Sequence, residues 1–259
     1  MTKFLKIFLL SFLSAILFLA IIAEIKYING KYNPVIYKVC IPQTKPSYET
    51  LKSRTVFIRG CTKENPEELS LLLPVIKDDE NGFCWGGTGV VIKITEDETY
   101  ILSNAHVIGR NTVKPTIFIE NTNESDRIQA EIIKYHPYDD LAVVKIRGHL
   151  KDKTALTKIT SIKIQDPIYI VGHPLAVRFI YTEGVMAGYV DSSLLIQAPC
   201  IYGNSGSGLW DKDGNLVGLV YALQMFNGFL GIPMPQITHA VAVNDIAIQQ
   251  FLKDLNLYE

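Results

Sequence analysis

Residues 89–102 read Gly-Val-Val-Ile-Lys-Ile-Thr-Glu-Asp-Glu-Thr-Tyr-Ile-Leu, and this stretch decides the fold class. β-Branched and apolar residues dominate both ends, which is typical of strands. Four polar residues, 95–98, lie between them and are typical of a turn. The stretch therefore predicts a β-hairpin made of residues 89–94 and 100–102.

The same strand-like pattern recurs on both sides of this hairpin. Short strands at regular spacing indicate an all-β sandwich or barrels and not an α/β fold. One helix is predicted at the end of the chain, where Asn244 can cap it and Ile248, Phe251, Leu252 and Leu255 form one apolar stripe. The other predicted strands are 55–58, 116–119, 128–135, 141–146, 168–171, 180–190, 194–197, 216–222 and 239–243.

The N-terminus carries the most hydrophobic segment. Residues 4–23 include 17 apolar residues, and no charged residue lies between Ile7 and Ala23. As a helix that uncharged run spans about 25 Å, close to the lower limit for crossing a bilayer. An uncleaved membrane anchor is favoured over a cleaved signal peptide, because the run is long and the expected small-residue cleavage pattern is poor. In both cases the remainder of the chain is predicted to be exported.

Composition excludes several classes of protein. The 259 residues carry 25 Lys and Arg against 26 Asp and Glu, a net charge of −1, so nucleic acid is not an expected partner. The chain shows neither a cluster with metal-ligand spacing nor a phosphate-binding loop, so no metal or cofactor is expected. An exported chain with four cysteines (Cys40, Cys61, Cys84 and Cys200) can form two disulfides in three possible pairings, or some can remain buried thiols.

A glycine-rich loop contains the best candidate nucleophile. Three glycines surround Ser205 in Gly203-Asn204-Ser205-Gly206-Ser207-Gly208, which is typical of a tight loop with converging N–H groups. A serine nucleophile also needs a base and a group that orients the base. His106 follows the 100–102 strand, and Asp140 opens another strand 34 residues later. Asp139 is the alternative to Asp140, since a shift of one residue reverses the face of a strand.

With these residues the sequence resembles the chymotrypsin/trypsin-like serine peptidases, and within them the high-temperature-requirement branch. Four motifs carry the resemblance over about residues 84–255. They are the glycine-rich strand 87–91, Ser103-Asn104-Ala105-His106-Val107, Asp140-Leu141-Ala142-Val143 and Gly203-Asn204-Ser205-Gly206. Gly172-His173-Pro174 adds weaker support. The resemblance implies two six-stranded antiparallel barrels with the active site between them.

The resemblance also implies a role for each residue. Ser205 would attack a peptide carbonyl, His106 would be the base, and Asp140 would orient it. The N–H groups of Gly203 and Ser205 would form the oxyanion hole. Substrate would contact Pro199, Tyr221 and Ala222. Residues 197–200 hold no carboxylate, so cleavage after a small or apolar residue is expected.

Taken together, the sequence predicts four regions and an exported or membrane-anchored serine endopeptidase that acts on proteins or peptides. The regions are the anchor or signal 1–23, an extension 24–83 leading into the first barrel, the first barrel 84–150, and the second barrel with the C-terminal helix, 151–259. The motif departs from Gly-Gly-Pro after Ser205, where Gly206-Ser207-Gly208 stands. A latent domain that acts as a binding or scaffold protein is therefore the alternative, and an esterase with the same triad is a third reading.

Overall fold

A computed structural model describes residues 45–63, 76–78, 81–109, 115–121, 127–227 and 233–258. The apolar run 4–23 and Cys40 lie outside these residues. In the described part of the chain, no helix is both long and apolar enough to cross a membrane.

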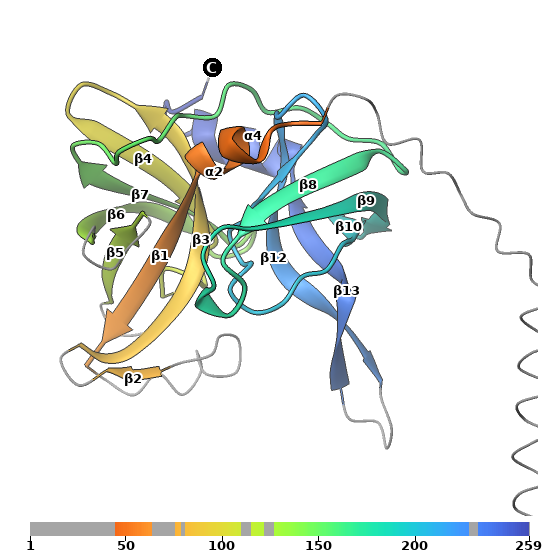
Figure 1. The fold of residues 1–259 in the computed structure, drawn as a ribbon, viewed down its shortest axis with the longest axis horizontal. Coiled ribbons are helices and arrows are strands. Elements are labelled where there is room, and N and C mark those ends of the chain that lie inside the picture. The colour runs from red at the N-terminus through yellow and green to blue at the C-terminus, as the bar shows by residue number, and fades with distance from the viewer. Residues whose placement is uncertain are drawn as a thin grey trace, which may run out of the picture. The chain divides into compact units, whose positions relative to one another are not determined.

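Two closed antiparallel barrels of six strands each make up the fold (Figure 1). The resemblance and the pattern of short strands are thereby confirmed at the level of the fold. The first barrel contains β1 (Thr55–Thr62), β3 (Gly82–Ile94), β4 (Glu98–Ser103), β5 (Thr116–Glu120), β6 (Ile128–His136) and β7 (Leu141–Arg147), with β2 (Ile76–Asp78) added at the edge of β3. The second contains β8 (Pro167–Gly172), β9 (Ile180–Val190), β10 (Ser193–Gln197), β11 (Gly208–Trp210), β12 (Leu216–Asn227) and β13 (Pro233–Asn244).

The first barrel begins earlier than the sequence predicts. Strand β1 starts at Thr55, within the region 24–83 assigned to an extension, and closes the barrel by pairing with both β3 and β5. Only 55–58 has an obvious strand pattern, because Arg59 and Gly60 interrupt the apolar run. The register of β1 against β3 places Cys61 opposite Cys84, and the two form a disulfide. Cys200 is a buried free thiol, and its burial raises its pKa to about 12.

Two short helices lie where the barrels meet. Helix α2 (Tyr48–Ser53) contributes Leu51, and helix α4 (Asp245–Lys253) contributes Ile248, Phe251 and Leu252 to a hydrophobic cluster shared by strands of both barrels. The predicted cap of α4 is confirmed, since the Asn244 side chain accepts a hydrogen bond from the N–H of Ala247 at 2.8 Å. Each barrel also has an apolar interior of its own. The barrels therefore form one packed unit, with loops from both available at their junction.

Candidate active site

His106 and Asp140 are in direct contact. His106 lies in the turn after β4, and Asp140 is the residue before β7, the neighbour of β4 in the barrel. His106 Nδ1 is 2.5 Å from Asp140 Oδ2, and the backbone N–H of His106 donates to Oδ1 at 2.9 Å. The Asp140 carbonyl accepts from Ala105 N–H and from the Asn104 amide, both at 3.0 Å. Four hydrogen bonds thus tie the two loops together and hold the imidazole with Nε2 as its remaining nitrogen.

The structure separates Asp140 from the alternative, Asp139. Asp140 adopts φ +53°, a left-handed conformation that Asp tolerates better than most residues. Its carboxylate is buried against His106, whereas Asp139 pairs with His136 at 3.0 Å and leaves 47% of its side chain exposed. Of the two carboxylates, Asp140 is the one that contacts His106.

The Ser205 loop is held between the two barrels. Gly206 has φ +84°, and a Cβ at this position would lie 1.9 Å from the carbonyl oxygen of Thr88, so only glycine fits. Thr88 N–H on β3 donates to the Ser205 carbonyl at 2.8 Å, and Gly206 N–H donates to the Val220 carbonyl on β12 at 2.8 Å. These bonds fix the backbone on both sides of the Ser205 hydroxyl.

Thr88 links the Ser205 loop to the histidine turn. Its carbonyl accepts a hydrogen bond from Ser103 Oγ at 2.7 Å, three residues before His106. The two loops therefore flank the same residue of β3. Within the described residues no hydrogen bond joins Ser205 Oγ to His106. Such bonds often form fully only when substrate is bound. Ser207 is buried, with its Oγ packed against Gly172.

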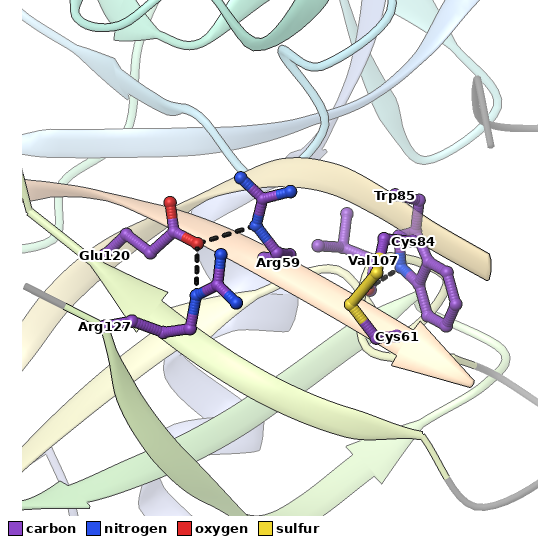
Figure 2. Close-up of a disulfide and its surroundings, with 7 residues drawn as sticks. All are labelled: Arg59, Cys61, Cys84, Trp85, Val107, Glu120 and Arg127. Atoms are coloured by element: carbon purple, nitrogen blue, oxygen red, sulfur yellow. Dashed lines mark hydrogen bonds and ion pairs between the residues drawn. A yellow bond between two sulfur atoms is a disulfide. The ribbon is translucent and has the colours of Figure 1, made fainter. Parts of the chain in front are cut away.

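The histidine turn is braced by an indole. Trp85 Nε1–H donates to the carbonyl of Val107 at 2.6 Å, and Trp85 follows the disulfide-bonded Cys84 (Figure 2). The Trp85 side chain is buried in the first barrel. This contact holds the residue after His106, so the disulfide and the histidine turn are parts of one rigid region.

A profile of the trypsin-like peptidase domain matches residues 82–219, which is more than half of the chain. The matched segment contains the His106 turn, the Asp140 loop and the Ser205 loop. The chain belongs to the trypsin-like peptidase family. Members of this family are serine-type hydrolases of peptide bonds, and the prediction drawn from the four motifs is confirmed at this level.

Relatives and solved structures agree with that family. The HtrA-like serine protease of Staphylococcus aureus (strain USA300) is 28% identical over 230 residues, covering 80% of this chain and 28% of the relative. The corresponding Staphylococcus epidermidis protein is 29% identical over 182 residues, covering 62% and 29%. The active form of the Rv3671c protease of M. tuberculosis has a TM-score of 0.56 at 18% identity, covering 78% of this chain and 81% of that one. The match spans under a third of the length of the two staphylococcal relatives.

The trypsin-like peptidase has a cavity of 290 Å³ beside Gly203. Its walls come from both barrels and combine aromatic, aliphatic and cationic side chains. The lining residues are Phe57, Arg59, Lys77, Cys84, Trp85, Gly86, Leu175, Ala176, Tyr202 and Gly203. Sequence reasoning missed this cavity, because its walls come from segments that are far apart in the chain.

The three predicted substrate contacts do not line this cavity. Tyr221 and Ala222 are half-buried on β12, and Pro199 is exposed after β10. The Tyr221 ring packs against the hydrophobic cluster between the barrels, and its hydroxyl is 3.3 Å from Ser193 Oγ. Contact of these three residues with substrate stays a prediction.

A buried histidine supports the loop that carries Gly203. Thr88 Oγ1–H donates to the Gly203 carbonyl at 2.8 Å, so at 3.1 Å it accepts from His173 Nδ1–H. His173 is fully buried between the rings of Phe57 and Phe179. Burial, with the nearby charges of Arg178 and Lys153, holds the pKa of His173 well below its usual value. The sequence offered no signal for this role beyond the Gly-His-Pro motif.

Stability of the peptidase is expected to depend on the neutral state of His173. Because its pKa is lower in the folded than in the unfolded chain, the unfolded chain binds the extra proton below about pH 6.5. The free energy of unfolding should therefore fall as pH drops below that value, by up to about 1.4 kcal/mol per pH unit from this group. Urea unfolding between pH 4.5 and 8 measures the slope of the free energy of unfolding against pH. His173→Asn keeps a donor toward Thr88 and should flatten the slope, so an unchanged slope would contradict the assignment.

Proposed function

We propose that this chain is a serine endopeptidase that hydrolyses proteins or peptides through an acyl-enzyme, with His106, Asp140 and Ser205 as its triad. The observation that carries the proposal is that two hydrogen bonds join His106 to the Asp140 carboxylate. One of them uses Nδ1, so Nε2 is the nitrogen that can accept the serine proton. Membership of the trypsin-like peptidase family supports it. The rigid Ser205 loop is further support, because a nucleophile must be held within reach of its base.

The chemistry follows from the positions of these groups. Ser205 Oγ attacks the carbonyl carbon as its proton moves to His106 Nε2, and Asp140 stabilises the imidazolium. Among the described residues no acceptor binds the N–H groups of Gly203 and Ser205, so both can donate to the oxyanion. The C–N bond then breaks, and His106 returns the proton to the leaving amine. Water, deprotonated by His106, hydrolyses the ester and restores Ser205.

The same proposal includes display outside the cytoplasmic membrane. Its support is the uncharged run from Ile7 to Ala23, preceded by Lys3 and Lys6. An anchor would hold the peptidase domain at the membrane surface, and a cleaved signal would release it.

Labelling with a fluorophosphonate probe tests the proposal. The full-length chain in its membrane fraction is expected to be labelled on Ser205, located by mass spectrometry, because only an activated serine reacts rapidly. His106→Ala should lose the label while remaining folded. Deletion of residues 1–23 should move labelled protein to the soluble fraction. A folded wild-type chain that takes no label would refute the triad, and full-length protein removed from membranes by alkaline washing would refute the anchor.

A further inference from the structure

The loop between β8 and β9, residues 173–179, is held in a strained backbone conformation. Three non-glycine residues have left-handed φ values: Leu175 at +50°, Ala176 at +62° and Phe179 at +55°. L-amino acids adopt this region at a cost, which persists only where surrounding contacts enforce it. Contacts from outside the loop must therefore hold it in place.

This loop sets the direction of the Gly203 N–H. Leu175 N–H donates to the Tyr202 carbonyl at 2.7 Å. In a trans peptide the C=O and N–H groups point in opposite directions, so the N–H of Gly203 points away from the loop. That N–H is the proposed oxyanion donor. Rotation of the Tyr202–Gly203 peptide would break the bond to Leu175 and remove the donor from the oxyanion site.

Arg178 anchors the loop to the opposite barrel. Its guanidinium donates to Glu120 Oε2 on β5 of the first barrel, and it lies 3.5 Å over the centre of the Phe57 ring on β1. The Arg178 side chain therefore crosses the junction between the barrels and makes two contacts there, an ion pair and a cation–π contact. They bind the loop three residues after Leu175.

The carboxylate that receives Arg178 is fixed within the first barrel. Glu120 is fully buried, and its Oε1 accepts from Arg59 Nε at 2.7 Å and from Arg127 Nε at 3.1 Å (Figure 2). Burial alone would raise the pKa of Glu120, but hydrogen bonds from Arg59 and Arg178 outweigh it and lower the pKa. The loop is thus tied to a charged group that cannot easily move.

We propose that the ion pair between Arg178 and Glu120 positions the oxyanion hole across the barrel junction, through Leu175 and the Tyr202–Gly203 peptide. The inference rests on the proposed function, because it assigns Arg178 and Glu120 as positioning residues for that reaction. Neither residue touches the reacting atoms in this arrangement. We call this ion pair between Arg178 and Glu120 the clamp. Loss of the clamp would let the strained loop relax and the Gly203 N–H turn away.

The test replaces Arg178 in the full-length chain. For Arg178→Met, kcat for a peptide substrate should fall about 10- to 100-fold, somewhat less than the loss of a whole oxyanion donor. KM should stay within about 3-fold, because the oxyanion bond forms only in the transition state. Arg178→Lys keeps the charge and the fold but not the planar fork, so it should lose part of kcat.

Arg127→Met is the matched control. Arg127 binds the same Glu120 carboxylate, but Oε1 keeps its shorter bond to Arg59, 2.7 Å against 3.1 Å, when Arg127 is replaced. Arg127 precedes β6 in the first barrel and makes none of the loop contacts above. Its kcat should stay within about 3-fold of wild type. An equal loss in Arg127→Met, or a folded Arg178→Lys and Arg178→Met with unchanged kcat, would overturn the clamp. So would a raised KM with kcat intact.

Amide hydrogen exchange tests the clamp by a measurement that does not depend on enzymatic activity. Exchange in segments 173–179 and 202–204 should be faster in Arg178→Met and unchanged in Arg127→Met, since opening of these segments follows local stability. Unchanged exchange in Arg178→Met would overturn the clamp. A wild-type chain that a fluorophosphonate does not label would instead refute the proposed function, so the two failures are distinct.

Discussion

Replacing Ser205 by alanine is expected to lower kcat/KM for peptide hydrolysis by about 10⁴-fold or more, because the acyl-enzyme cannot form without its oxygen. The backbone bonds of this loop do not use the Ser205 hydroxyl: Thr88 N–H binds its carbonyl, and Gly206 N–H binds Val220. The variant should therefore fold with the wild-type Tm. Steady-state hydrolysis of a peptide library, with circular dichroism on the same samples, measures both quantities.

Ser207→Ala is the control for this variant. Ser207 lies in the same loop two residues later, but its hydroxyl is buried against Gly172 and has no hydrogen-bond partner in the described part of the chain. Removal of a buried unpaired hydroxyl should not destabilise the fold, and the rate should stay within about 3-fold. Peptide hydrolysis that survives in Ser205→Ala and disappears in Ser207→Ala would show that Ser207, and not Ser205, is the nucleophile.

Asp140→Asn is expected to produce the second largest loss, about 10⁴-fold in kcat. The imidazole needs an acceptor at Nδ1, where Asp140 Oδ2 lies 2.5 Å away. An asparagine amide that donates there would force the proton onto Nε2 and leave His106 unable to accept one from Ser205. The other contact, from His106 N–H to Oδ1, can persist, so the variant should remain folded.

Asp139→Asn separates this effect from a general loss of negative charge. Asp139 is adjacent in sequence, pairs with His136 and is about half exposed. A surface ion pair contributes little to stability, so kcat should stay within about 2-fold of wild type. Comparison of kcat in the two variants, each normalised to folded protein by thermal unfolding, decides between the carboxylates. A greater loss in Asp139→Asn would reverse the assignment.

Local sequence patterns were sufficient for most of the strands and for the C-terminal helix. The β3–β4 hairpin follows from β-branched and apolar runs on either side of a polar turn, because both signals depend on neighbours along the chain. The bounds of strand β9 also agree with the predicted range 180–190. Strand β1 was recognised only in part, since Arg59, Gly60 and Cys61 find their environment through pairing with β3 and β5. The Cys61–Cys84 pairing was equally beyond the sequence, which left three connectivities open.

By itself the sequence determined the all-β class, the resemblance to trypsin-like peptidases and the three residue types of the candidate triad, because each depends on short motifs. Only the tertiary structure decided that Asp140 and not Asp139 meets His106, since one residue of register separates a buried carboxylate from an exposed one. Only closure of both barrels brought Thr88, His173 and Gly203 together, and joined Arg178 to Glu120. These contacts link residues 58 to 115 positions apart, and such long-range neighbours leave no periodic trace in a single chain.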